Sequence, residues 1–518
     1  MKRMTTALAS ACAAGAIITA AVGAGTAGPA AAAPAGNNGD VKNVIYLLGD
    51  GMGRTHVTAG RERFYGANGR LAMETMPSHG FVSTYSVEKK SGQPGQPGFA
   101  PNYVTDSASA ATAWSSGVKT YNAALGVDAK GELAPTVMEM AKQAGYRTGN
   151  VSTAEITDAT PAGQMSHALA RGCQGPVYSA KSCQDTAVTG AELPASDLRV
   201  TPIAKQIARN GTADVIFGGG LSRFDTADEK ALRDQGYDVL SSPASQKVAT
   251  KDDLAKAQGG KVFGLFNKGN LTIEKSKQDN PAAAEAKEPT LAEMTRKSIE
   301  LLSSGKGTGG KGANGDNGNR DGDNNDTQGK GFYLQVEGAL IDKRSHANDA
   351  AQTLEEIKAF DDAVAVALDF AKKDGHTLVI TTADHECAGF NIIEKGSFTN
   401  AEAANPPVNT DGGNPANNST PARTGGNSKD PSRSSGIVNG AGAGDPHNFA
   451  PATFRTADDA AGVTDGTKDA SLWLTYLSGN HTGADVPIYS YGAGSEKLQG
   501  TVDNIDLFGI VTDALRLR

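Results

Sequence analysis

Two polar residues of this 518-residue chain, Asp50 and Ser107, have neighbours that suit ion binding or nucleophilic attack. Asp50 follows the apolar run at residues 44–48 and lies between two glycines, which let the backbone and a bound ion approach closely. Ser107 precedes a run of small residues that predicts a tightly packed helix. A serine in the first helical turn meets free N–H groups and a dipole that favour a phosphate group, so Ser107 is a candidate nucleophile. A serine that only caps the helix is the alternative for this segment alone.

Three other places supply imidazole groups next to carboxylates. Asp342 and His346 are four residues apart and would share one face of a helical turn. Asp384 and His385 are adjacent and follow a β-branched run, while His481 stands in a polar segment before the last apolar run. Carboxylate and imidazole groups are common zinc ligands, so these residues are candidates for metal binding. The alternatives are a chance pair on a solvated helix and an exposed histidine in a loop.

A third group offers oxygen atoms and a guanidinium. Asp158 and Thr160 follow the predicted strand at residues 148–152, and Glu337 comes at the end of another predicted strand. Asp50, Thr160 and Glu337 would together make an oxygen-only site, which suits magnesium. Arg171 offers a planar fork that can hold two phosphate oxygens. Taken singly, each of these residues is also compatible with a capping or surface role.

The elements that must position these residues follow from hydrophobic periodicity. Strands are expected at residues 41–48, 148–152, 213–217, 332–336, 377–382 and 486–491, and helices at residues 135–144, 202–209, 291–302, 350–373 and 504–515. Apolar strands that alternate with helices predict an α/β fold with a large, mostly parallel central sheet and helices on both faces. Sites in such sheets form where the carboxyl ends of the strands emerge. We therefore expect Asp50, Glu337, Asp384 and His385 to meet at one edge, where two metal ions about 4 Å apart could serve an in-line displacement.

The amino-terminal segment resembles an export signal. Lys2 and Arg3 precede a stretch rich in Ala, Ile and Val, and small residues at 31–33 offer a cleavage site. A membrane anchor is the alternative, but the stretch is mostly Ala and Gly, whereas a span needs ~20 strongly apolar residues. We predict a signal peptide at residues 1–33 and one catalytic domain at residues 34–518. Low-complexity segments near residues 303–331 and 400–448 are expected to be flexible inserted loops.

Charge and cysteines narrow the class of protein. The formal charge is −8, and loss of Lys2 and Arg3 with the signal, which has no acidic residue, would change it to −10. This acidity argues against a nucleic-acid partner, which would need clustered basic residues. Cys173 and Cys183 flank a short loop and would pair in an oxidising compartment, unless they are two unrelated thiols. Cys387 is left alone, and we assign it no role.

The motifs occur together in an order that is similar to that of the alkaline phosphatases, specifically the secreted bacterial type. The matching segments are Gly49-Asp50-Gly51-Met52-Gly53, Thr105-Asp106-Ser107, Ser152–Pro161, Glu337–His346, Thr382-Ala383-Asp384-His385 and His481-Thr482-Gly483. They extend over nearly the whole chain after the signal. The resemblance implies hydrolysis of small-molecule phosphate monoesters at alkaline pH.

The resemblance also implies roles for individual residues. Ser107 would become a phosphoserine, Arg171 would clamp the phosphate, and Asp158 and Lys343 would lie beside these groups. The first of two zinc ions would be bound by Asp342, His346 and His481, and the second by Asp50, Asp384 and His385. Asp50, Thr160 and Glu337 would hold one magnesium ion. Gly172 departs from the basic residue that often follows the arginine in this family.

Other functions remain open at this point. A phosphodiesterase or sulfatase of the wider superfamily would share the metal-binding strand ends but differ at the nucleophile. A non-catalytic phosphate-binding protein could dispense with Ser107. We expect a secreted enzyme, extracellular or periplasmic, with no membrane association in its mature form, and we treat a homodimer as a family expectation only.

Overall fold

The computed structural model describes residues 40–176, 180–304, 330–395, 452–467, 469–477 and 479–518. The predicted signal peptide and the segment at residues 400–448 lie outside these ranges. The segment at residues 303–331 lies outside them except at its ends, where Ser303 belongs to a helix. A unit that begins at Asn37 and runs to the end of the chain contains every described residue.

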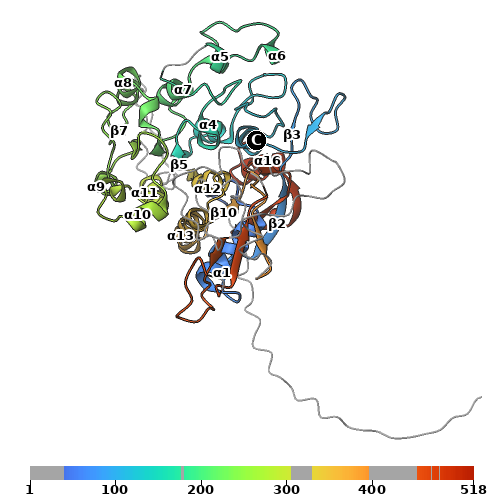
Figure 1. Cartoon of the computed structure of the whole chain (residues 1–518). Coiled ribbons are helices and arrows are strands. Elements are labelled where there is room, and N and C mark those ends of the chain that lie inside the picture. Colours follow the sequence, from blue (N-terminus) through green and yellow to red (C-terminus); the bar gives the residue numbers. More distant parts are fainter. Residues whose placement is uncertain (1–39, 177–179, 305–329, 396–451, 468, 478) are drawn as a thin grey trace, which may run out of the picture. The chain divides into compact units, whose positions relative to one another are not determined.

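A large mixed sheet forms the centre of this unit (Figure 1). Among the described residues it has ten strands, in the order β17 (Gly500–Asp503), β2 (Ser78–Ser83), β16 (Val486–Tyr491), β10 (Thr377–Thr382), β1 (Asn43–Gly49), β9 (Phe332–Gly338), β5 (Arg147–Glu155), β6 (Val215–Gly219), β8 (Val262–Leu265) and β7 (Asp238–Val239). Strand β16 runs antiparallel to both of its neighbours, and the other described pairs are parallel. The prediction of a mostly parallel sheet is therefore confirmed.

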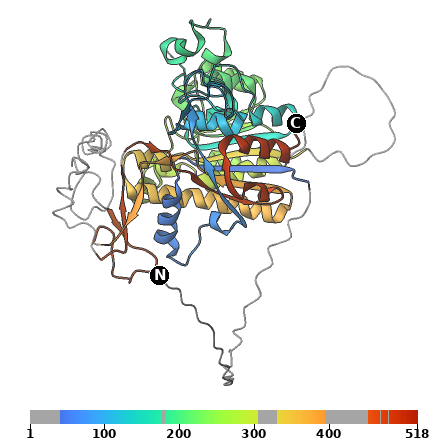
Figure 2. The ribbon, with the colours of Figure 1, turned by 90° about the vertical axis from the view of Figure 1, so that its right-hand side faces the viewer.

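Helices cover both faces of the sheet, as predicted (Figure 2). One layer contains α11 (Leu291–Ser303) and the long α13 (Ala350–Asp374), which pack on β5, β9, β1 and β10. The opposite layer contains α2 (Ser107–Ser116), α3 (Val137–Gln143), α4 (Ala159–Met165) and α16 (Asn504–Ala514). Every residue of β1, β9 and β10 is buried, because both faces of these strands lie under helices.

The predicted elements match the observed ones within a few residues. The segment predicted at residues 202–209 is α7 (Ile203–Asn210), which has a strongly amphipathic sequence. The alternative that His481 is an exposed histidine in a loop does not hold. His481 lies in β15 (His481–Thr482), which pairs antiparallel with β11 (Glu386–Cys387). This pairing gives His481 a fixed position beside the residues that follow β10.

A small three-stranded sheet adjoins the main one. It consists of β12 (Asn391–Ile393), β14 (Leu472–Thr475) and β13 (Ala452–Phe454), and it packs with Phe390 and Tyr476 into a second apolar cluster. Helix α1 (Arg54–Tyr65), which follows Asp50, contacts β12 and β14. The small sheet therefore supports the segment that carries Asp50.

Candidate active site

Ser107 is the first residue of α2, as its sequence context predicts. Asp106 caps the helix, since its carboxylate accepts a hydrogen bond of 3.0 Å from the Ser109 N–H. The Ser107 side chain is buried, and its Oγ lies 3.1 Å from Nε2 of His385. All ten residues of α2 are buried and most are small, so the helix fits closely between its neighbours. The hydroxyl thus has a fixed position at the positive end of a helix dipole.

Asp342, His346 and His481 form the first metal group. The first two lie one turn apart on α12 (Leu340–His346), with His346 Nε2 3.2 Å from Asp342 Oδ2. His481 Nε2 lies 3.5 Å from Asp342 Oδ1 and 3.1 Å from His346 Nε2. Each imidazole directs its other nitrogen to a backbone carbonyl, that of Gly479 for His346 and that of Thr105 for His481. In metal sites, a ligating histidine usually donates its other ring N–H to a carbonyl or a carboxylate, which fixes the orientation of the ring. The two carbonyl contacts seen here would do the same.

Asp50, Asp384 and His385 form the second metal group, which is fully buried. Nε2 of His385 lies 3.1 Å from Asp384 Oδ2 and 3.7 Å from Asp50 Oδ1. The Asp384 carboxylate also accepts a 3.0 Å hydrogen bond from the Gly51 N–H, which ties the end of β10 to the end of β1. The potential ligand atoms of each group lie within 4.8 Å of one another.

Asp50, Thr160 and Glu337, the oxygen-only group, come from neighbouring strands and from α4. Glu337 lies in β9 beside Leu48 of β1, and the Asp50 N–H donates to the Gly338 carbonyl at 3.3 Å. Ser152 of β5 donates a very short hydrogen bond to Glu337. Burial raises the pKa of Glu337 to about 8, even though the hydrogen bond from Ser152 opposes this shift.

Arg171 lies between two carboxylates. Its guanidinium donates to Asp106 at 3.1 Å and to Asp158 at 2.8 Å, and Lys343 donates to the other oxygen of Asp158 at 2.8 Å. Burial alone would raise the pKa of Asp158, but Lys343 and Arg171 outweigh it and hold the pKa well below its ordinary value. Asp106 therefore connects α2, which begins with the candidate nucleophile Ser107, with Arg171, the predicted phosphate clamp.

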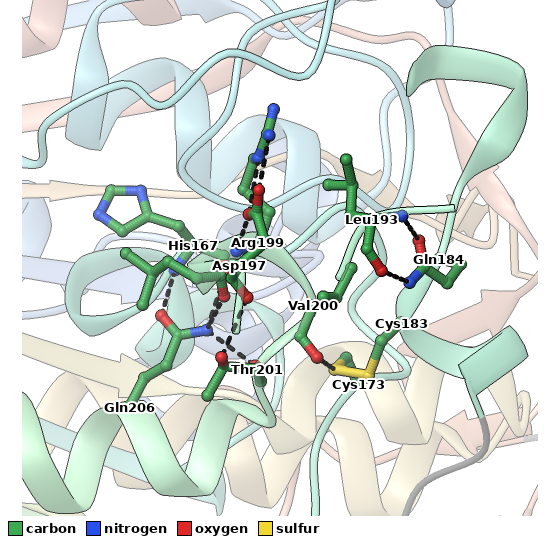
Figure 3. Close-up of a disulfide and its surroundings, with 11 residues drawn as sticks. His167, Cys173, Cys183, Gln184, Leu193, Asp197, Arg199, Val200, Thr201 and Gln206 are labelled. Atoms are coloured by element: carbon green, nitrogen blue, oxygen red, sulfur yellow. Dashed lines mark hydrogen bonds and ion pairs between the residues drawn. A yellow bond between two sulfur atoms is a disulfide. The ribbon is translucent and has the colours of Figure 1, made fainter. Parts of the chain in front are cut away.

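A disulfide between Cys173 and Cys183 follows Arg171 by two residues, and the predicted pairing is confirmed (Figure 3). The Cys173 carbonyl accepts a 2.8 Å hydrogen bond from the Ile203 N–H at the start of α7. Gln206 of the same helix bonds both the N–H and the carbonyl of His167, as Figure 3 shows for the first of these bonds. The segment that carries Arg171 is thereby held on both sides.

Three buried carboxylates of the two metal groups, from the ends of β1 and β10 and from α12, have oxygens without a hydrogen bond. Among the described residues, Asp50 Oδ1, Asp342 Oδ1 and Asp384 Oδ2 are buried without a hydrogen-bond partner. Burial raises the pKa of Asp50 well above its ordinary value, and Asp384 and Asp342 add to the shift by repulsion. Unpaired buried charge is costly unless a metal ion or a cation compensates it. The two metal groups therefore fit divalent cations, with carboxylate and imidazole ligands that suit zinc.

Sequence reasoning assigned no role to four residues that complete this arrangement: Asp106, Ser152, Glu386 and Cys387. Glu386 accepts hydrogen bonds from Thr482 and from the N–H groups of Gly389 and Phe390, and so connects β11 with β15. Cys387 is the free cysteine of the described ranges, and its sulfur lies among the ligand atoms of the first metal group. Burial raises the pKa of its thiol well above the ordinary value. Their positions next to the recognised motifs were the available signal.

Comparison with known proteins agrees with this arrangement. The sequence model of the alkaline phosphatase family matches residues 41–517. Alkaline phosphatase from Escherichia coli K12 is 40% identical over 370 residues, which are 66% of this chain and 70% of that protein. Streptomycin-6-phosphate phosphatase from Streptomyces griseus is 33% identical over 499 residues, covering 92% of this chain and 91% of the relative.

Solved structures show the same fold. The alkaline phosphatase of the Antarctic bacterium TAB5 superposes with a TM-score of 0.58 at 24% identity, covering 92% of this chain and 98% of that one. The alkaline phosphatase of Thermus thermophilus gives a TM-score of 0.61 at 22% identity, with 93% and 92% covered. The family match spans far more than half of the chain. This chain therefore belongs to the alkaline phosphatase family and is a phosphoric monoester hydrolase.

Proposed function

We propose that this protein is an exported alkaline phosphatase that transfers the phosphoryl group of a monoester to Ser107 before water releases it as inorganic phosphate. The position of Ser107 carries the proposal, because its hydroxyl stands at the positive end of α2 and 3.1 Å from His385 Nε2. Asp106, which precedes Ser107, also contacts Arg171. A nucleophile, a metal group and a phosphate clamp thus meet at one helix end.

We assign two zinc ions and one magnesium ion to this site. Asp342, His346 and His481 would hold one zinc ion, and Asp50, Asp384 and His385 the other. Asp50, Thr160 and Glu337 would hold magnesium, since all their donor atoms are oxygens. When bound, the ions would act as Lewis acids that stabilise charge on the attacking and leaving oxygens.

The protein's own residues determine the two displacements. Ser107 Oγ attacks phosphorus and releases its proton to solvent, while the ester P–O bond breaks and the departing alkoxide takes up a proton from solvent. Water then attacks the phosphorus of the phosphoserine and gives up a proton. The bond from phosphorus to Ser107 Oγ breaks, Oγ takes up a proton, and inorganic phosphate leaves. Arg171 binds two non-bridging oxygens in both steps, and Asp158 and Lys343 keep its guanidinium oriented.

Turnover of p-nitrophenyl phosphate at alkaline pH tests this proposal. We expect activity in the wild type, its loss on chelation, its recovery with zinc and magnesium, and a decrease of roughly 10³-fold or more in Ser107→Ala. Ser116→Ala, at the far end of the same helix, controls for local packing. Activity on diesters or sulfates alone would contradict the monoester assignment, and phosphate binding without any turnover would favour a binding protein. Streptomycin 6-phosphate is a second monoester to compare, given the relative named for it.

Export has its own test. No helix within the described ranges is long and apolar enough to cross a membrane. If residues 1–33 are a signal peptide, the protein recovered outside the cytoplasm will begin near residue 34 by intact mass. Replacement of Lys2 and Arg3 by Glu should retain the uncleaved chain in the cell. An exported chain that still begins at Met1 would contradict the assignment.

A further inference from the structure

Cys387 is buried among the proposed ligands of the first metal group. It lies in β11, directly opposite His481 in the register of the β11–β15 pair. Its N–H donates a 3.0 Å hydrogen bond to the Gly51 carbonyl, and its Sγ lies 3.7 Å from the Asp342 carbonyl oxygen. Three separate contacts therefore fix this sulfur beside the group.

The four potential ligand atoms are close enough to share one ion. Those of Asp342, His346, Cys387 and His481 all lie within 4.8 Å of one another. Ligand bonds of ~2.0–2.3 Å in a tetrahedral zinc site place the ligand atoms about 3.3–3.8 Å apart, so the group needs only a small contraction. Asp342 Oδ1 is buried without a hydrogen bond, and the atom that it faces is His481 Nε2 at 3.5 Å, which is itself one of the proposed ligand atoms.

The backbone at Gly51 keeps the sulfur and the carboxylate close together. A Cβ atom at this position would lie 2.8 Å from both Asp342 Oδ1 and the Cys387 Cβ. Gly51 also has a φ of +68°, a conformation that side chains other than glycine rarely adopt. Glycine at this position therefore leaves the space in which Asp342 and Cys387 approach each other.

We propose that Cys387 is a sulfur ligand of the metal ion bound by Asp342, His346 and His481. This inference rests on the metal site of the proposed function and adds one donor to it. On binding, the thiol S–H bond is replaced by a sulfur–metal bond, and the proton is released to solvent. A thiolate favours zinc, cobalt or cadmium over magnesium or calcium, so this group should discriminate strongly between these classes of ion. Zinc sites can expand to five ligands, which leaves a position for the reaction.

Cobalt substitution of the full-length protein tests the proposal directly. We expect the wild type with bound Co²⁺ to show a sulfur-to-metal charge-transfer band in the near ultraviolet. Cys387→Ser should lose this band, keep the visible bands of bound cobalt and bind zinc roughly 10- to 100-fold more weakly at this group. In the chain that begins near residue 34, Cys387 is the one cysteine outside the disulfide, and in the uncleaved chain Cys12→Ser is the matched control, which should leave the band unchanged.

X-ray absorption of the zinc-loaded wild type makes the test independent of any variant's folding. A zinc–sulfur distance of about 2.3 Å supports the proposal. An active protein with its metal ions bound but with neither zinc–sulfur scattering nor the charge-transfer band would show that Cys387 only packs, and the proposed function would stand. A wild type that binds neither zinc nor cobalt would overturn both.

Discussion

Arg171 shows how one side chain can depend on several parts of the chain. Its guanidinium donates to Asp106, which caps α2, and to Asp158, which caps α4. The backbone N–H of Arg171 donates to the Ala123 carbonyl at 2.7 Å. Burial alone would lower the pKa of the Arg171 guanidinium, but the carboxylates of Asp158 and Asp106 outweigh burial and raise this pKa above its ordinary value. The side chain is thus charged and oriented before substrate arrives, which lowers the cost of binding a phosphate.

Replacement of the Arg171 guanidinium by the ammonium group of lysine should lower activity without changing the fold. We expect Arg171→Lys to lower kcat/KM by roughly 10²- to 10³-fold and to weaken competitive inhibition by inorganic phosphate, because one charge replaces two aligned donors. Steady-state kinetics with phosphate as inhibitor measures both. Arg233→Lys is the control, since Arg233 pairs with Glu229 on the surface of α8 (Thr226–Asp234). Equal phosphate inhibition of Arg171→Lys and the wild type would contradict the clamp.

Two helices that pack together carry several of the proposed site residues. Helix α2 begins with Ser107, and α4 contains Thr160 and is capped by Asp158. They meet where Gly163 faces Ala111, and Ser115 donates a 3.0 Å hydrogen bond to the Gly163 carbonyl. The spacing of these helices therefore sets the distance between the nucleophile and the groups on α4.

A methyl group at this contact should separate the helices. In Gly163→Ala the new Cβ would lie 2.7 Å from the Ala111 side chain, so one helix must shift. We expect a loss of about 1–3 kcal/mol in unfolding free energy and a decrease in kcat of roughly 10- to 100-fold. Gly462→Ala, at an exposed position with open space around it, controls for the added methyl. Unchanged kcat in Gly163→Ala would show that the spacing tolerates the shift.

The contact between α13 and α10 (Glu274–Asp279) should depend on pH. Glu356 of α13 accepts a 2.7 Å hydrogen bond from the Glu274 N–H, and burial, followed by repulsion from Glu274, raises its pKa from 4.5 to about 8. The folded protein therefore holds a proton that the unfolded chain has already lost between these two values. Stability must fall as pH rises from about 4.5 to about 8, where the buried carboxyl ionises.

Removal of this charge should protect the protein at alkaline pH. We expect the melting temperature of Glu356→Gln, relative to the wild type, to increase by about 2 °C or more between pH 6 and pH 9.5. Glu355→Gln, at the adjacent and partly exposed position, should show no such trend. Calorimetry at several pH values measures the difference, and parallel curves for Glu356→Gln and the wild type would contradict the assigned pKa.

The elements with strong patterns could be predicted, whereas those that depend on pairing could not. Strands β1, β9 and β10 are mainly apolar or β-branched, because both of their faces are buried. The expectation that sites form at the carboxyl ends of such strands indicated Asp50, Glu337 and Asp384. The short polar strand β17 (Gly500–Asp503) has no such pattern. His481 and Cys387 come together only through a two-residue pairing of β11 with β15, for which the local sequence carries no signal.

The molecule as a whole gathers like charges into its interior. Asp50, Asp342 and Asp384 repel one another, and this repulsion contributes to the raised pKa of Asp50. Bound cations would therefore support the fold as well as the reaction, because they bind the folded chain and have no preformed site in the unfolded one.

Chelation should consequently lower the melting temperature as well as the activity. An ion whose free concentration is 1,000 times its dissociation constant adds about 4 kcal/mol to the free energy of unfolding. The metal-free protein should therefore melt several degrees lower. Ser107→Ala separates the two effects, since it should be inactive yet show the same decrease on chelation. A melting temperature that stays constant while the metal content falls to zero would contradict a stabilising role.

The position of β1 in the sheet has a consequence for the timing of synthesis. Its two neighbours, β9 and β10, come from much later in the chain. At ~10 residues per second, a ribosome needs on the order of half a minute after making β1 before β9 exists. The apolar strand lacks its neighbours during that interval, so the centre of the main sheet cannot form until late in synthesis. Any nascent chain that terminates before His481 also lacks one ligand of the proposed first metal site, so under this proposal activity would report full-length translation.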